Sequence, residues 1–265
     1  MKNLRIFYHS FLIKMREILA YRLEFLAGFF GPIAINTVVL TMLWSSILKY
    51  QGVDHINGMS LSGFVMYYYL VSVGQRVLIG AGIGYISRDI YYGEINKYLI
   101  YPLNFQVFKW GTYFAPTVTY LLQLLLFIVL HKVFWGNSIE FVDLSQGAIL
   151  LLLGAYCYFL IMNSIEYLAF WFENIWSLGV SLRAFLEFAG GFFIPLSFFP
   201  DAVQRFLNFT PFPAMLYRPV QIILGNESYS FLSCALLLLF WILIFFCLDR
   251  FVWKLGRENY TGVGI

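Results

Sequence analysis

The chain has 265 residues, of which 61% are hydrophobic and only 12% are charged. Soluble domains carry about 25% charged residues, so the composition excludes an ordinary soluble protein and indicates a membrane protein. The net charge of +3 gives no indication of a nucleic-acid partner, and we expect none.

Residues 3–21 predict an amphipathic helix that lies in the plane of the membrane interface. One face carries Leu4, Phe7, Tyr8, Phe11, Met15 and Ile18, and the opposite face carries Asn3, Ser10, Lys14 and Glu17. The alternative is that this segment merely extends the first membrane span. Basic residues interrupt it too often for the apolar core of a cleavable signal peptide.

Six long apolar segments follow, and each exceeds the roughly 20 residues that a helix needs to cross the bilayer. Because no water satisfies backbone groups there, each must be helical. The predicted fold is therefore an all-α polytopic membrane protein that forms a single transmembrane domain over residues 1–265. The expected spans are about 25–47, 62–86, 111–134, 146–170, 176–197 and 230–253.

Lysine and arginine residues predict the orientation of these spans. With the N-terminus inside, twelve of the 17 basic residues fall on the inner side. Lys49, Lys132, Arg205 and Arg218 fall outside, and Arg76 lies within a span. This bias predicts that both termini are cytoplasmic.

Residues 87–103, between the second and third spans, form the most polar run in this part of the chain, and we call them the hinge. Ile86, Ile90 and Tyr91 fall at helical spacing, Gly93 is a natural left-handed stop, and Pro102 ends a second short helix near Tyr101. We expect the charged residues on the other side: Arg88, Asp89, Glu94 and Lys97. Such a helix pair suits docking onto a soluble partner, and the alternative is a solvated loop.

A few ionisable residues fall inside the predicted spans, where they are costly and are functional candidates. Arg76 lies in the second span, and Glu166 or Glu187 is its candidate partner. Arg183 and Glu187 stand one helical turn apart and are expected to pair locally. The alternative for Arg76 is that its side chain reaches the inner interface.

The segment between the fifth and sixth spans is too long for a tight turn and too apolar for an ordinary aqueous loop. Five prolines divide it, namely Pro195, Pro200, Pro211, Pro213 and Pro219, and a short helix is expected at 202–208. Irregular backbone at membrane depth is tolerated only against protein or a wet cavity. We therefore expect re-entrant or surface-lying half-helices on the outer side, within residues 198–229.

Several motifs are absent from the sequence. It contains no G-x-x-x-x-G-K-[ST] phosphate loop, no H-E-x-x-H pair and no G-x-S-x-G elbow. Its histidines (His9, His55 and His131) do not cluster, and its three cysteines (Cys157, Cys234 and Cys247) lie inside apolar runs without metal-ligand spacing. We expect no catalytic residue, no metal site and no cofactor in this chain.

Three stretches together resemble the permease subunits of type-2 ATP-binding-cassette exporters, in particular the compact six-helix bacterial branch. They are DIYYGEINKYLIYPL (Asp89–Leu103), GGFFIPLSFFP (Gly190–Pro200) and LNFTPFPAMLYRPVQIILG (Leu207–Gly225). With the six spans, the resemblance covers nearly the whole chain. Each motif alone is loose, and their order and spacing make the match specific.

The resemblance implies that two six-helix permeases, identical or paralogous, pair around a translocation path in a bacterial plasma membrane. Each receives a cytoplasmic ATPase subunit that binds ATP and Mg. The hinge then becomes the coupling helix, through Arg88, Asp89, Gly93, Glu94, Lys97, Tyr98 and Pro102. Residues 3–21 become the interfacial helix, and the proline-rich segment caps the path. The competing hypotheses are a lipid-modifying membrane enzyme and a membrane assembly scaffold.

Overall fold

The computed structural model describes residues 2–80, 85–101, 103–135, 139–173 and 175–260, and these are predominantly helical. The α-helices are α1 (Lys2–Ala20), α2 (Arg22–Gln51), α3 (Leu61–Ile79), α4 (Tyr85–Tyr91), α5 (Asn96–Ile100), α6 (Phe105–Trp135), α7 (Phe141–Glu166), α8 (Trp176–Ala189), α9 (Asp201–Asn208), α10 (Phe212–Met215), α11 (Tyr217–Ile223) and α12 (Phe231–Asn259). Two 3-10 helices, η1 (Tyr167–Phe170) and η2 (Leu196–Phe198), and one small hairpin, β1 (His55–Ile56) with β2 (Met59–Ser60), complete the described elements.

Three of the helices in the described ranges are long and apolar enough to cross a membrane. They are Arg22–Gln51, Phe141–Phe170 and Phe231–Asn259, and they correspond to the first, fourth and sixth predicted spans. The helix α6 also covers the third predicted span and begins six residues earlier than 111. These elements confirm an all-α membrane protein, while the count of six spans stays a prediction.

Two predicted spans differ from the structure in length, and glycine is the reason in both cases. The helix α3 ends at Ile79 because Gly80 adopts a positive φ of 56°, so the predicted run to residue 86 is not one continuous helix. The helix α8 ends at Ala189, before Gly190 and the positive-φ Gly191, rather than at residue 197. Its 14 residues extend about 21 Å, less than the bilayer core.

The helix α7 lies at the centre of the molecule, and most of its apolar stretch is buried. It packs against α3, α11, α10 and α12, whereas α2 and α12 remain mostly exposed. Side chains such as Tyr67, Tyr68, Leu150 and Leu151 are almost fully buried in the main core. The exposed faces of α2 and α12 are apolar, as expected for helices that contact lipid or another subunit.

The helix α1 packs along α6, and the side chains that face α6 match the predicted apolar face only in part. Ser10 is only 1% exposed, whereas Leu4 and Tyr8 are exposed at 73% and 56%. The two helices approach so closely at Gly111 of α6 that a Cβ there would collide with the Ser10 hydroxyl. Ser10, a small polar residue, therefore lies on the buried face of α1, although the hydrophobic pattern predicts it on the polar face of the helix.

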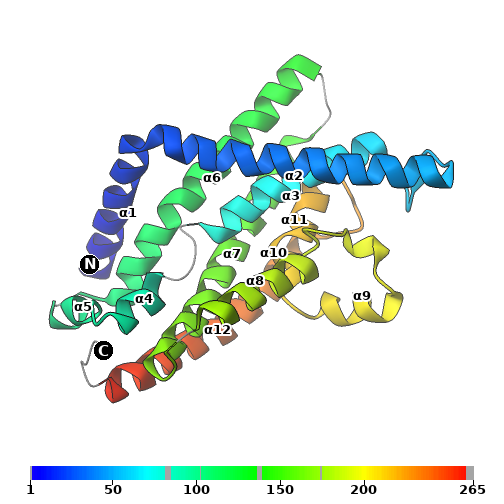
Figure 1. Ribbon diagram of the computed structural model, residues 1–265. Coiled ribbons are helices and arrows are strands. Elements are labelled where there is room, and N and C mark those ends of the chain that lie inside the picture. The colour runs from blue at the N-terminus through cyan, green and yellow to red at the C-terminus, as the bar shows by residue number, and fades with distance from the viewer. Residues whose placement is uncertain (1, 81–84, 102, 136–138, 174, 261–265) are drawn as a thin grey trace.

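The hinge and the proline-rich segment lie at opposite ends of the molecule (Figure 1). The helices α4 and α5 lie near the start of α1 and the end of α12, while α9 and the β1–β2 hairpin lie at the far end. The hinge, the start of α1 and the end of α12 therefore lie at the same end of the molecule, and their side of the membrane stays a prediction.

The proline-rich segment forms short helices, and α9 confirms the short helix predicted at 202–208. The helices α10 and α11 are buried against α7 and α3. Glycines on α7 permit this close approach, since a Cβ at Gly154 would lie 2.8 Å from the backbone oxygen of Met215. The backbone of α10 and α11 is therefore covered by protein, whereas α9 is mostly exposed.

Candidate functional site

The hinge folds as two short helices joined by a tight turn, as the sequence predicts. Gly93 adopts a positive φ of 72° between α4 and α5. The N–H of Ile95 donates to the carbonyl oxygen of Asp89 over 2.9 Å, which closes the turn. Tyr101 is extended after α5, as expected for a residue before proline. Pro102 itself lies outside the described residues.

A small hydrophobic core of its own supports the hinge. Its buried members come from α4, the turn, α6, η1 and α12, and they are Ile86, Ile90, Ile95, Phe105, Tyr167 and Trp253. The rings of Phe105 and Trp253 stack at a centroid distance of 4.7 Å. Because these residues belong to several long helices, the hinge rests on the ends of those helices instead of extending freely into solvent.

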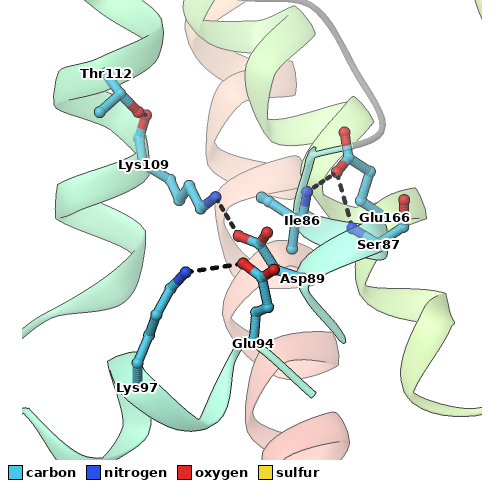
Figure 2. Close-up of polar contacts among 8 residues, drawn as sticks. All are labelled: Ile86, Ser87, Asp89, Glu94, Lys97, Lys109, Thr112 and Glu166. Atoms are coloured by element: carbon cyan, nitrogen blue, oxygen red, sulfur yellow. Dashed lines mark hydrogen bonds and ion pairs between the residues drawn. The ribbon is translucent and has the colours of Figure 1, made fainter. Parts of the chain in front are cut away.

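The carboxylate of Glu166, at the end of α7, anchors the start of α4. Its Oε2 accepts hydrogen bonds from the backbone N–H of Ile86 at 2.6 Å and of Ser87 at 3.2 Å (Figure 2). The first N–H groups of a helix have no partner within the helix, and an anion there is favourable. Of the two candidate partners of Arg76, Glu166 thus binds the start of α4, whereas Glu187 is near enough to Arg76 to interact with it electrostatically.

A second anchor is an ion pair between Asp89 of α4 and Lys109 of α6. The Lys109 Nζ lies 2.9 Å from the Asp89 Oδ2, and the two side chains are only 13% and 7% exposed (Figure 2). The prediction that all four hinge charges face outward is therefore wrong for Asp89. Removing two charges from water is tolerated here because each satisfies the other. This pair fixes α4 to α6.

The remaining hinge charges are exposed. The Lys97 Nζ lies 2.9 Å from the Glu94 Oε2, with both side chains about half exposed (Figure 2). The hydrogen bond and the charge of Lys97 lower the pKa of Glu94, and the same bond raises the pKa of Lys97. Arg88 is exposed and lies 5.6 Å from the centroid of the Tyr85 ring. These three side chains are available to a partner.

Tyr98 links the exposed and anchored parts of the hinge. Its ring is half-buried and packs against Phe105, with the centroids 5.1 Å apart. The ammonium of Lys109 lies 5.5 Å from the same ring centroid, and that of Lys97 lies 5.1 Å from it. Burial raises the pKa of the Tyr98 phenol. The phenol is therefore neutral at physiological pH.

Other polar candidates lie well away from the hinge. Arg183 and Glu187 of α8 form the predicted pair, with the Arg183 Nε 2.8 Å from the Glu187 Oε1. Arg76 of α3 is half-buried and has no ion pair within the described part of the chain. It is near enough to Arg183 and Glu187 to interact electrostatically, and it lines a cavity of about 420 Å³ with Asn36 and Ser72.

The predicted prolines of the outer segment delimit its short helices. Pro195 precedes η2, Pro200 precedes α9 and Pro211 precedes α10, while Pro213 and Pro219 lie within the first turns of α10 and α11. Two tyrosines hold the preceding loop, because the hydroxyls of Tyr67 and Tyr68 donate to the carbonyl oxygens of Gly191 and Phe193. These prolines set the backbone path of the segment.

Sequence reasoning missed the contact of Lys109 with Asp89, 20 residues away, and the contact of Glu166 with the start of α4. No local pattern marks either contact, since both depend on how α4 packs against α6 and α7. Among the residues that the structure describes, no group of three histidine, cysteine or acidic side chains is placed to hold a metal ion.

Comparison with known proteins gives one family. A family model described as "ABC-2 family transporter protein" matches residues 34–264. The match covers most of the chain, including the hinge and the outer segment, and it begins within α2, so α1 lies outside it. A search of curated proteins found no match.

Proposed function

The chain belongs to the ABC-2 transporter family and is therefore a membrane transport permease, and we propose that it forms half of an exporter's translocation path and couples to a separate ATPase subunit. In this proposal the second half is another six-helix permease, identical or paralogous. ATP and Mg are bound by a cytoplasmic ATPase dimer, and the complex lies in a bacterial plasma membrane.

The observation that carries the proposal is the double anchoring of the hinge. The Glu166 carboxylate attaches α4 to α7, and the Asp89–Lys109 pair attaches α4 to α6. A force on the exposed hinge face is therefore transmitted to two long helices instead of being lost in a flexible loop. This is the property that a coupling element requires.

The exposed face of the hinge has the composition of a docking surface. Next to the charged residues it presents Tyr91, Tyr92, Ile100 and Tyr101, which are 44%, 64%, 80% and 60% exposed. Aromatic side chains within a charged surround are typical of protein interfaces. In our proposal this face rests on the ATPase subunit, and the charges select the partner and its orientation.

Transport then follows from a switch between two packed arrangements. Closure of the ATPase dimer moves the hinge, and α6 and α7 carry the motion toward the outer half-helices α10 and α11, which pack directly on α7. Arg76 and the Arg183–Glu187 pair are the proposed polar groups of the path, because they are the ionisable side chains on α3 and α8.

The test is a double substitution, Arg88→Ala with Glu94→Ala, in the permease reconstituted with a phosphate-loop ATPase subunit that co-purifies with the unmodified chain. We expect normal membrane insertion, with permease-dependent stimulation of ATP hydrolysis reduced about tenfold or more, because two interfacial charge contacts are lost. If the ATPase subunit no longer co-purifies with the double variant, this would also indicate that the hinge contacts have been weakened.

The matched control is Lys254→Ala with Glu258→Ala, which removes two exposed, oppositely charged side chains from the end of α12 without touching the hinge. It should leave ATPase stimulation unchanged. If the hinge variant also stimulates the ATPase normally, or if no nucleotide-hydrolysing subunit contacts the hinge in the assembled complex, the proposal is wrong.

A further inference from the structure

A cavity of about 350 Å³ lies behind the hinge, between α1, α4, α6 and α7. This volume is within the range of small-molecule sites. It is separate from the proposed path, since Arg76 and Arg183 do not line it, and it shares Arg88, Glu94 and Lys97 with the exposed face of the hinge. Its wall combines aromatic rings, including Tyr85, Tyr98 and Phe108, with charged groups from every surrounding helix.

Most charges in the cavity wall are already neutralised. Three of its cations pair with carboxylates: Lys14 with Glu17, Lys97 with Glu94 and Lys109 with Asp89. The carboxylate of Glu166 accepts two backbone N–H groups. Arg88 is the cation of this wall that forms no ion pair among the described residues, although Glu94 is near enough to interact with it electrostatically. Its guanidinium is therefore the wall cation that can contact an added anion directly.

Asn163 of α7 supplies a second, independent observation. Its side chain lines the cavity and is only 5% exposed, and its amide nitrogen has no hydrogen-bond partner among the described residues. An unsatisfied buried donor costs about 1–3 kcal/mol, so such groups are rare unless a ligand or water completes them. A ligand oxygen inside the cavity would satisfy it.

The position of α1 indicates where such an anion comes from. This helix closes one side of the cavity with Ile13, Lys14 and Glu17, and it presents the exposed apolar side chains Leu4 and Tyr8 on its outer surface. A helix with this pattern lies among lipid headgroups. The cavity therefore opens at the level at which the phosphates of the inner leaflet lie, given the membrane placement in the proposed function.

We propose that this cavity binds the phosphodiester headgroup of an inner-leaflet glycerophospholipid, with Arg88 contacting the phosphate at the mouth and Asn163 donating to a headgroup oxygen inside. The guanidinium of arginine matches phosphate oxygens in geometry as well as charge. A bound headgroup contacts α1, α4, α6 and α7 together and holds the hinge against the long helices.

The experiment uses the full-length permease alone, delipidated in a phosphate-free maltoside detergent, so that its outcome does not depend on any ATPase. Dihexanoyl-phosphatidylglycerol is titrated while the thermal unfolding midpoint is followed. Binding to the folded state should raise the midpoint in proportion to the logarithm of the lipid concentration. Arg88→Gln and Asn163→Leu should each raise the dissociation constant about tenfold or more.

Two control variants separate binding from structural damage. Arg257→Gln removes an exposed cation from α12, and Ser164→Ala removes a hydroxyl from α7 that donates to the carbonyl of Leu160. Both should bind the lipid like the unmodified chain. Asn163→Leu should also unfold at an equal or higher temperature without lipid, because it removes an unsatisfied donor.

A second titration with glycerol 3-phosphate distinguishes the source of the phosphate. If glycerol 3-phosphate binds as tightly as the lipid, the cavity recognises phosphate, and the proposal that the phosphate belongs to a lipid is overturned. The whole proposal is overturned if neither compound shifts the midpoint, or if Arg88→Gln and Asn163→Leu bind as tightly as their controls.

Discussion

The buried ion pair of the hinge decides how firmly α4 is held. If Asp89→Asn or Lys109→Met is made alone, the remaining charge stays buried without its partner, which costs about 3–5 kcal/mol of stability. We expect either variant to unfold at a clearly lower temperature in detergent. The combined variant should recover most of this loss, because neither charge then remains.

This double-mutant cycle is measured by the unfolding midpoint at constant detergent concentration. With single losses of about 3–5 kcal/mol, recovery in the combined variant requires a coupling energy of at least about 3 kcal/mol, the upper end of the usual range for residues in contact. If the two single losses simply add in the combined variant, the pair does not anchor α4 and the proposed transmission through α6 loses its basis.

The exposed Glu94–Lys97 pair should instead control how the hinge responds to pH. Lys97 holds the pKa of Glu94 below its ordinary value, so the contribution of the pair is complete above the unfolded-state pKa, about 4.3. It is lost as the pH falls through the lower folded-state pKa. At cytoplasmic pH both charges persist, and the docking face keeps its charge pattern.

Carboxyl NMR of the ¹³C-glutamate-labelled chain measures this effect directly. Lys97→Met should raise the pKa of Glu94, whereas Lys254→Met on α12 should leave it unchanged. An unchanged Glu94 pKa in the Lys97 variant would show that the contact does not persist in solution.

The hinge also shows what a sequence can and cannot predict about single residues. The conformations of Gly93 and Tyr101 are predicted correctly, because a left-handed stop and a pre-proline residue are local properties. The same pattern wrongly places Asp89 in solvent with the other charges. Its burial depends on Lys109 in the next helix, and a periodicity argument confined to one segment contains no information about that contact.

At the level of elements, glycines of α7 allow the backbone of the outer half-helices to approach closely, and this packing holds the half-helices in place. A Cβ at Gly154 would lie within 3 Å of two backbone atoms of Met215 in α10, and backbone cannot move aside as a flexible side chain does. Gly154→Ala should therefore displace α10 and destabilise the protein by about 1–3 kcal/mol.

The control is Gly28→Ala in α2, where an added Cβ meets nothing within 4 Å. Alanine is favoured over glycine in a helix interior by up to about 1 kcal/mol, so this variant should be neutral or more stable. The unfolding midpoints of Gly154→Ala and Gly28→Ala test this prediction. Equal midpoints would contradict the packing of α10 on α7.

Long apolar helices are the most predictable elements, because hydrophobicity alone identifies them. The starts of α2 and α12 fall within three residues of the predicted spans. The errors occur where glycine ends a helix inside an apolar run, as at Gly80 and Gly190–Gly191. Hydropathy does not distinguish a helix from the irregular apolar backbone that follows it.

At the scale of the whole molecule, the function depends on the two ends lying on opposite sides of a membrane. The hinge and the helix α9 lie at opposite ends of the structure (Figure 1), and the distribution of basic residues predicts that the hinge is inside. In the proposed assembly, the exposed apolar faces of α2 and α12 contact lipid or the second permease.

Single introduced cysteines test this orientation in a background in which Cys157, Cys234 and Cys247 are replaced by serine. Glu94→Cys in the hinge and Glu227→Cys after α11 both lie at exposed positions. A membrane-impermeant maleimide added to intact cells should label only the Glu227→Cys variant, and the Glu94→Cys variant should react only after the membrane is opened.

The physical reason for expecting a single orientation is the cost of moving the basic residues of the hinge through the bilayer. Each of these charges costs about 2.5–3.5 kcal/mol at the centre of a membrane-spanning helix, so a mixed population is not expected. Labelling of the hinge position in intact cells would place it out of reach of a cytoplasmic ATPase and would contradict the coupling proposal at its foundation.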